Sequence, residues 1–254
     1  MRKSVLITGG ASGLGKTLTK CFAKENYDVY LTYNTSYENA KKIRDELEKE
    51  YKVNINIFKC DLRNEHEIND VLKNIGYVDV LVNNAAIEID KEFNEKTKED
   101  FLNTLEVNLI APFLISREIG NKMKERKNGK IINIASNNAI DKMDPITLEY
   151  DASKAALINL THNLAKEFAP FVNVNAIAPG WIKTEKIKQI DNELNNLFIN
   201  EESKNILLNR FAEEIDIANL VLFLASDKAN YINNEVIRID GGTYDRWKDK
   251  KSSI

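Results

Sequence analysis

The fold is decided near the N-terminus, by the stretch VLITGGASGLG at residues 5–15. Its first four residues, VLIT, predict a short buried strand. Leu14, Leu18 and Phe22 recur at helical spacing, so a helix is predicted directly after the glycines. A strand, a glycine-rich turn and a helix N-terminus form a phosphate-binding geometry, because glycines let the backbone approach a pyrophosphate and unpaired N–H groups face it. The stretch therefore predicts a dinucleotide-binding α/β fold.

The spacing of these glycines differs from the common dinucleotide fingerprint. Residues 8–15 read TGxxxGxG, whereas the common pattern is GxGxxG. A plain tight turn between a strand and a helix explains the same residues. The stretch by itself leaves that alternative open, and the decision depends on a second motif.

The second motif is YDASK at residues 150–154. On a helix, Tyr150 and Lys154 are neighbours one turn apart. A nearby ammonium favours the ionised phenol, so a tyrosine whose usual pKa is near ~10 is expected to move protons at neutral pH. Asp144 and Pro145 predict an N-cap and a first helical residue, and Ala169-Pro170 predicts the end of that helix. Tyr150 and Lys154 are thus expected in its second and third turns.

Strand and helix signals alternate along the whole chain, with no repeat and no linker. Seven strands are predicted, at residues 4–8, 28–33, 53–59, 78–82, 130–135, 172–178 and 235–240. Helical crossovers between parallel strands are right-handed and place the ligand at the carboxyl ends of the strands. The prediction is a single-domain, Rossmann-type, doubly wound α/β fold: a seven-stranded parallel sheet with helices on both faces.

Composition argues against several functional classes. The chain has 254 residues and a net charge of −3, with 36 basic residues scattered against 39 acidic ones, which does not suit an electrostatic nucleic-acid binder. Its two cysteines, Cys21 and Cys60, belong to no metal-binding or disulfide pattern, so no metal site is expected. No stretch has the length of a signal peptide core or a membrane span. A cytoplasmic enzyme without membrane contact is the expectation.

Both motifs together, in this order, resemble the short-chain dehydrogenase/reductase family over nearly the whole chain. The resemblance extends to Asp61 after the third strand, NNAA at residues 83–86 after the fourth, PGWIKT at residues 179–184, and the closing segment up to Gly242. It implies an NAD(P)-dependent oxidoreductase that transfers hydride between nicotinamide and a carbonyl or secondary alcohol.

The resemblance implies a catalytic tetrad of Asn108, Ser136, Tyr150 and Lys154. In it Ser136 binds the substrate carbonyl, Tyr150 donates or removes the proton, and Lys154 binds the nicotinamide ribose and favours the tyrosinate. Asn108 takes part in a proton relay through water to the lysine. Pro112 lacks the N–H that would bond the carbonyl of Asn108, so a helix kink is predicted to leave that carbonyl free to hold a water. A kinked packing helix with a buried amide is the alternative.

The resemblance also implies which residues hold the cofactor. They are Thr8, Gly9, Ser12, Gly13, Leu14 and Gly15 in the first stretch, Tyr33 and Asn34 after the second strand, then Asp61, Leu62, Asn83, Ala85, Tyr150, Lys154, Pro179, Gly180, Ile182 and Thr184.

Cofactor choice depends on the end of the second strand, where NAD enzymes place a carboxylate. Tyr33 and Asn34 stand there instead, and Asn34, Thr35 and Ser36 can donate hydrogen bonds to a 2′-phosphate. No arginine clamp is evident, since Ser12 stands where many NADP-preferring relatives carry arginine. NADP(H) is favoured over NAD(H).

The sequence indicates the substrate less clearly than it indicates the reaction. Within the family, the chain most resembles the 3-oxoacyl-[acyl-carrier-protein] reductases, and residues 129–136 and 209–242 carry this resemblance. This implies an acyl-thioester substrate, acyl carrier protein as a partner, and basic docking residues near Lys127. Ala86 and Ala139 depart from glycines common in those reductases. A sugar, polyol or small-ketone dehydrogenase therefore remains open, as does a catalytically silent dinucleotide-binding regulator, against which the intact tetrad argues.

The resemblance further divides the chain. Residues 1–242 form the domain, with integral substrate-binding loops at 137–148 and 185–208, and residues 243–254 form a C-terminal tail that covers a pocket or interface, or is disordered. An apolar pocket wall is predicted, with core packing as its alternative, from Met143, Trp181, Ile187, Ile190, Leu194 and Phe198. In relatives the helices carrying Asn108 and Tyr150 form subunit interfaces, so a homotetramer or homodimer is expected.

Overall fold

The computed structural model describes residues 2–244. Of the predicted tail, only Thr243 and Tyr244 are included, and residues 245–254 lie outside the described part. These two residues pack on the segment before the closing helix: Thr243 pairs with Ile206 in a β-bridge, and the Tyr244 N–H donates to the carbonyl of Asn205 at 3.0 Å.

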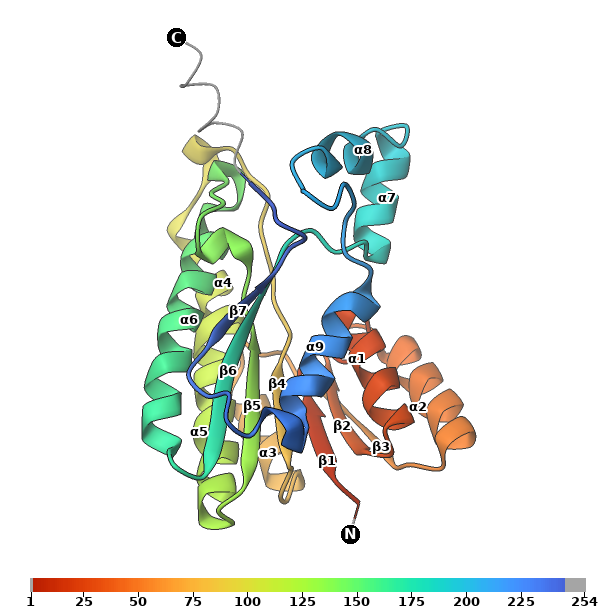
Figure 1. Ribbon diagram of the computed structural model, residues 1–254, viewed down its shortest axis with the longest axis vertical. Helices are drawn as coiled ribbons and strands as arrows, with labels where there is room; N and C mark the ends of the chain where they lie inside the picture. The colour runs from red at the N-terminus through yellow and green to blue at the C-terminus, as the bar shows by residue number, and fades with distance from the viewer. Residues whose placement is uncertain (1, 245–254) are drawn as a thin grey trace.

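A parallel sheet forms the centre of the molecule (Figure 1). Its strands are β1 (Ser4–Ile7), β2 (Asp28–Tyr33), β3 (Ile55–Lys59), β4 (Val80–Asn83), β5 (Gly129–Ile134), β6 (Val172–Pro179) and β7 (Val236–Ile239). They follow the order β3-β2-β1-β4-β5-β6-β7, and each neighbouring pair is parallel. The predicted doubly wound, seven-stranded fold is confirmed. The strand order reverses between β1 and β4, which is where such folds bind their ligand.

Helices cover both faces of this sheet. One face is packed by α1 (Gly13–Lys24), α2 (Tyr37–Tyr51) and α9 (Glu214–Ala225), and the other by α3 (Glu65–Asn74), α5 (Ala111–Glu125) and α6 (Leu148–Phe168), with α4 (Lys98–Leu105) against α6. Two short helices, α7 (Glu185–Glu193) and α8 (Phe198–Ser203), stand beyond the carboxyl edge of the strands (Figure 1). Single 3₁₀ turns occur at Phe93–Glu95, Asn137–Ala139, Pro145–Thr147 and Asp227–Ala229.

The helix predicted around Asn108 is interrupted by a π-helical segment. Thr97 and Asp100 cap the start of α4 reciprocally, and the chain then widens into a π-helix over Glu106–Ile110 before α5 begins. Pro112 lies in the first turn of α5, where its missing N–H is tolerated. The predicted irregularity at Asn108 is therefore a π-helical segment.

The helix that carries Tyr150 begins later than predicted. Asp144 accepts a hydrogen bond from the N–H of Ile146 at 3.0 Å, but it caps the 3₁₀ turn Pro145–Thr147. Because α6 itself starts at Leu148, Tyr150 lies in its first turn and Lys154 in its second.

Candidate active site

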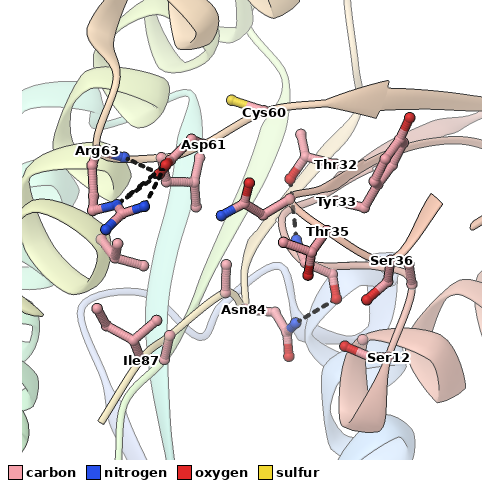
Figure 2. Close-up of a pocket in the computed structure, with 18 of the residues that line it drawn as sticks. Ser12, Thr32, Tyr33, Thr35, Ser36, Cys60, Asp61, Arg63, Asn84 and Ile87 are labelled. Atoms are coloured by element: carbon pink, nitrogen blue, oxygen red, sulfur yellow. Dashed lines mark hydrogen bonds and ion pairs between the residues drawn. The ribbon is translucent and has the colours of Figure 1, made fainter. Parts of the chain in front are cut away.

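A cavity of about 510 Å³ opens at the carboxyl ends of the first four strands (Figure 2). Its lining includes half of the predicted cofactor residues, namely Gly9, Ser12, Leu14, Gly15, Tyr33, Asn34, Asp61, Leu62 and Ala85. The cavity sits at the reversal of strand order, and its volume is in the range of small-molecule sites.

The glycine-rich turn fits a diphosphate. A Cβ on Gly15 would lie 2.1 Å from the carbonyl oxygen of Gly9 and 2.7 Å from the side-chain amide of Asn84, so only glycine permits this approach. The first turn of α1 holds no acidic residue, and Ser12 makes no side-chain capping bond to it. Its N–H groups and its positive dipole end are therefore available to an anion.

The side chains of Thr8 and Asn83 are buried behind the wall of the cavity and do not line it. Each is 2% exposed. The hydroxyl of Thr8 accepts from the N–H groups of Asn84 and Ala85 at 3.0 Å, and the amide of Asn83 donates to Ser116 at 2.9 Å and to Asn133. Asn84, the next residue along, lines the cavity instead. The side chain of Asn84 thus faces the cavity where that of Asn83 does not, because neighbouring side chains leave a strand on opposite sides. A contact between Asn83 and the cofactor stays a prediction.

Several lining residues were not predicted from sequence, among them Thr32, Cys60, Arg63 and Ile87, whereas Thr35 and Ser36 line the cavity as their predicted contact with a 2′-phosphate requires. The guanidinium of Arg63 holds Asp61 through Nη2–Oδ2 at 2.6 Å and Nε–Oδ1 at 3.0 Å. These hydrogen bonds keep the pKa of Asp61 below its usual value. Burial raises the pKa of the Cys60 thiol to about 12, so this cysteine is unreactive at neutral pH.

The two sides of the cavity differ in their chemistry (Figure 2). Ser12, Thr35 and Ser36 lie on one side, and the Asp61–Arg63 pair lies on the opposite side. The hydroxyl of Ser36 makes no capping bond to α2. The side at the end of β2 thus offers hydroxyl groups, while the arginine of the lining, Arg63, is engaged with Asp61 across the cavity.

Three members of the predicted tetrad meet where β5 ends. Ser136 lies close enough to Tyr150 for its hydroxyl to lower the pKa of the phenol. The Nζ of Lys154 lies 5.5 Å from the ring centroid of Tyr150 and donates to the carbonyl of Ile134 at 2.7 Å. Lys154 is only 2% exposed, so its ammonium is held inside the protein beside the phenol.

The prediction that Lys154 lowers the pKa of Tyr150 is wrong for the protein's own groups. Burial raises the pKa of the phenol, the carboxylate of Glu88 raises it further, and the hydrogen bond from Ser136 opposes them. Burial also lowers the pKa of Lys154 to about 8, against the opposite pull of Glu88. The ammonium contacts a carbonyl and the face of the ring, not the phenolic oxygen, so desolvation prevails.

Asn108 connects the loop after β4 to α6. Its side chain is fully buried; Nδ2 donates to the carbonyl of Ile87 at 2.9 Å and to the hydroxyl of Ser153 at 3.0 Å, while Oδ1 accepts from the N–H of Ile87 at 2.9 Å. Ser153 stands directly before Lys154. Through its bond to Ser153, Asn108 thus lies beside the other members of the predicted tetrad. The water relay predicted for Asn108 stays a prediction.

A buried ion pair next to Tyr150 was missed from sequence. Glu149 is fully buried, the side chain of Lys96 is 4% exposed, and their charged groups lie 2.5 Å apart. Both also bond the backbone of one residue: Ile89 donates its N–H to Glu149 at 3.2 Å, and its carbonyl accepts from Lys96. The partners are 53 positions apart, and neither belongs to a motif, so no sequence pattern marks them.

The remaining predicted cofactor residues follow β6. Pro179, Gly180, Ile182 and Thr184 lie outside the cavity described above. Thr184 caps α7, and its methyl group would lie 3.9 Å from a Cβ placed on Gly13. This loop therefore reaches the glycine-rich turn.

The predicted apolar pocket wall is mostly a small separate core. Trp181 stacks on Phe211 at 5.5 Å, and Phe198 packs edge-on against both rings. Ile187 and Ile190 join this cluster between α7 and α8. Met143 is 81% exposed and Leu194 49% exposed. The core-packing alternative thus describes four of the six residues.

Within residues 2–244, no group of three or more histidine, cysteine, aspartate or glutamate side chains is placed to hold a metal ion. In the same range, no helix has the length and apolar character needed to cross a membrane.

Comparisons with known proteins agree with this geometry. A family model described as enoyl-(acyl carrier protein) reductase matches residues 9–244. The 3-oxoacyl-[acyl-carrier-protein] reductase of Staphylococcus epidermidis is 34% identical over 96% of this chain and 100% of its own length. The enzyme of the same name from Aquifex aeolicus is 35% identical over 95% and 97%.

Solved structures show the same similarity. ElxO with NADP bound is 32% identical, with a TM-score of 0.86 over 95% of this chain and 98% of its own. A protein from Beutenbergia cavernae that is provisionally named a gluconate 5-dehydrogenase is 29% identical, with a TM-score of 0.86 over 97% of both chains. The chain belongs to the short-chain dehydrogenase/reductase family and is an NAD(P)-dependent oxidoreductase that acts on CH–OH groups.

Proposed function

We propose that this protein reduces the carbonyl group of 3-oxoacyl thioesters, with NADPH as the hydride donor. The observation that carries the proposal is the meeting of Ser136 and Tyr150 with buried Lys154, whose Nζ lies 5.5 Å from the ring centroid of Tyr150. The 3-oxoacyl group is supported by the two reductases of that name, which are 34% and 35% identical along nearly their whole length.

In this proposal, some side chains of the protein bind the substrate and the cofactor, and one transfers the proton. The nicotinamide supplies the hydride. Ser136 holds the substrate oxygen by a hydrogen bond, and Tyr150 gives that oxygen a proton as the alcohol forms. Lys154 binds the nicotinamide ribose. Asn108 fixes the peptide of Ile87 and the hydroxyl of Ser153, and thereby the spacing between α6 and the loop after β4.

A dehydrogenase of sugars, polyols or small ketones is the second candidate. It is favoured by structural similarity to L-sorbose reductase from Gluconobacter frateurii, complexed with NADPH and L-sorbose, which is 25% identical with a TM-score of 0.90. That protein covers 96% of this chain, and the match spans 97% of its own. Its sequence identity to this chain is lower than that of the two 3-oxoacyl reductases, so a 3-oxoacyl thioester remains the proposed substrate.

A panel of carbonyl compounds tests the proposed function. We expect NADPH oxidation with the N-acetylcysteamine thioester of acetoacetate to exceed that with L-sorbose or acetoin by about tenfold or more in kcat/KM, because specificity is the ratio of these values. The measurement is the loss of NADPH absorbance with each compound at equal enzyme concentration. A higher kcat/KM with a sugar or a small ketone would establish the second candidate instead.

NADP(H) is part of the proposal, and a substitution at the end of β2 tests it. Asn34→Asp places a carboxylate beside Ser12, Thr35 and Ser36, where it repels a 2′-phosphate and accepts from a ribose hydroxyl. We expect the Kd for NADPH to rise about tenfold and that for NADH to fall, measured by the fluorescence of the bound cofactor. Asn34→Ala is the matched control that adds no charge. A preference of the unmodified protein for NADH would contradict the proposal.

The proposal extends to assembly and partners. Residues 1–242 form one catalytic domain in the cytoplasm, with residues 137–148 and 185–208 at the substrate. Acyl carrier protein is the proposed partner, and Lys127 is an exposed cation whose Nζ lies 5.7 Å from the ring centroid of Phe171. A homotetramer or homodimer is proposed because Leu102, Ile110 and Phe113 are between 39% and 45% exposed near Asn108 and Pro112.

A further inference from the structure

The loop that leads into α6 is anchored to this helix by one carboxylate, that of Asp151. Its Oδ1 accepts from Nδ2 of Asn138 at 2.8 Å and from the hydroxyl of Thr147 at 3.2 Å. Its Oδ2 accepts from the N–H of Asp144 at 3.0 Å. Asp151 directly follows Tyr150 on α6, so the loop is fastened at the residue next to the phenol.

The first of these donors, Asn138, also contacts Ser136. The backbone N–H of Asn138 donates to the hydroxyl oxygen of Ser136 at 3.2 Å, at the start of the short turn Asn137–Ala139. Ser136 is 8% exposed. A hydroxyl group has one proton to donate and accepts through its lone pairs. Because the oxygen of Ser136 accepts from this N–H, its proton is left for another oxygen.

These contacts connect the two residues that the proposed function places at the substrate oxygen. They run from the hydroxyl of Ser136 to the backbone of Asn138, and from the side chain of Asn138 to the carboxylate of Asp151. One peptide then leads from Asp151 to Tyr150. Asn138 and Asp151 are 13 positions apart, and both are half-buried. A hydrogen bond to a carboxylate is roughly twice as strong as one between neutral groups, so this pair is a firm link between the end of β5 and α6.

We propose that Asn138 and Asp151 are positioning residues for the carbonyl reduction: together they hold the hydroxyl of Ser136 in the orientation, and at the spacing from Tyr150, that the substrate oxygen needs. The inference rests on the proposed function, in which Ser136 binds the substrate oxygen and Tyr150 gives it a proton. Such spacing matters for the rate because a misplacement of about 1 Å costs about 10²-fold.

The pair permits a test by exchange of its two side chains. Asn138→Ala removes the amide, and Asn138→Asp places a second carboxylate against that of Asp151. In the double variant Asn138→Asp with Asp151→Asn, an amide again donates to a carboxylate. The oxygen of that amide still accepts from the N–H of Asp144, and the hydroxyl of Thr147 turns to accept from its nitrogen. The exchange therefore keeps every bond of the anchor.

The matched control is Asn54→Ala. Asn54 also donates through Nδ2 to a carboxylate, that of Asp28 at 3.1 Å. This second pair lies between the starts of β2 and β3, at the edge of the sheet opposite to the site. Its loss therefore removes a bond of the same kind without touching Ser136.

We measure kcat with the N-acetylcysteamine thioester of acetoacetate and with L-sorbose, and the Kd for NADPH by fluorescence. Asn138→Ala should lower kcat about tenfold while the Kd for NADPH stays within about twofold, because a loosened hydroxyl costs rate and not cofactor binding. Asn138→Asp should lower kcat at least as far. The exchanged double variant should return to within about threefold of the unmodified protein, and Asn54→Ala should stay within about twofold.

A Ser136→Ala background separates positioning from a general loosening of the loop. If Asn138 acts through Ser136, Asn138→Ala should lower kcat by less than about twofold in this background, since the hydroxyl that it orients is already absent. A loop that is merely less stable would lower kcat by the same factor in both backgrounds.

Three results would overturn the proposal: equal factors in the two backgrounds, a double variant no more active than Asn138→Asp, or a loss in Asn138→Ala no larger than that in Asn54→Ala. The use of two substrates separates this outcome from the proposed function. If L-sorbose is reduced and the thioester is not, the proposed function fails, and the rates with L-sorbose still test the pair. If neither compound is reduced, both proposals fail.

Discussion

Tyr150→Phe is expected to lower kcat by about a thousandfold or more while the Kd for NADPH stays within about twofold. The phenol is the proton donor that the proposed function assigns to the site beside Ser136, and the loss of a general acid costs about 10²–10⁴ in rate. The ring itself still packs over Lys154, so cofactor binding is preserved. The measurements are NADPH oxidation with the acetoacetyl thioester and the fluorescence of bound NADPH.

Tyr231→Phe is the matched control, because Tyr231 is fully exposed and far from this chemistry in sequence. Residual activity of Tyr150→Phe above about one-tenth of the original rate would reject the role of the phenol. A loss of NADPH binding together with the activity would show instead that the hydroxyl is needed to assemble the site.

The raised pKa of Tyr150 also predicts how the two directions of the reaction depend on pH. Burial and the charge of Glu88 keep the phenol protonated at neutral pH, which is the form that donates a proton. Reduction should therefore be nearly level between about pH 6 and 7.5, whereas oxidation of the alcohol, which needs the tyrosinate, should rise with pH. Above about 8, Lys154 loses its charge and the reduction rate should fall.

Glu149→Ala is expected to lower the free energy of unfolding by about 3–5 kcal/mol, since it leaves the ammonium of Lys96 buried without its counter-charge. It also removes the acceptor of the Ile89 N–H. The double variant Lys96→Met with Glu149→Leu replaces both charges by apolar groups and should recover most of this loss. The measurement is urea unfolding followed by circular dichroism, with cofactor-free protein at one concentration.

The exposed pair of Lys73 and Asp70 provides the comparison for this buried pair. Its removal by Asp70→Ala should lower the free energy of unfolding far less than Glu149→Ala does, because both side chains are more than 70% exposed. Equal losses from Asp70→Ala and Glu149→Ala, or a double variant no more stable than Glu149→Ala, would contradict the proposed cost of an unpaired buried charge.

Much of the fold was predictable because its signals are local. Each of the seven strands lies within two residues of its predicted bounds, since a short apolar run between glycine, proline or polar residues marks a buried parallel strand wherever it occurs. The meeting of Ser136, Tyr150 and Lys154 was predictable for the same reason. One residue ends a strand, the other two lie one turn apart on a helix, and the fold brings both elements to the same edge.

Other features had no local signal. Whether Asn83 or Asn84 faces the cavity depends on where β4 ends, and a shift of one residue exchanges the two side chains. Trp181 and Phe198 are apolar, and apolar residues are expected both in a pocket wall and in a core, so the sequence does not distinguish the two placements. Their contacts with Phe211 decide between these alternatives.

The sequence by itself determined the architecture, the dinucleotide-binding crevice and the identity of the candidate catalytic residues, because strand runs, glycine spacing and helical neighbours are properties of short segments. Only the tertiary structure decided the electrostatics of the site. It buries Lys154, partly encloses Tyr150, and pairs Lys96 with Glu149 and Glu88 with Lys186. Desolvation and charge pairing depend on which distant residues surround a group, so the direction of the pKa shift of Tyr150 could be read only from the folded chain.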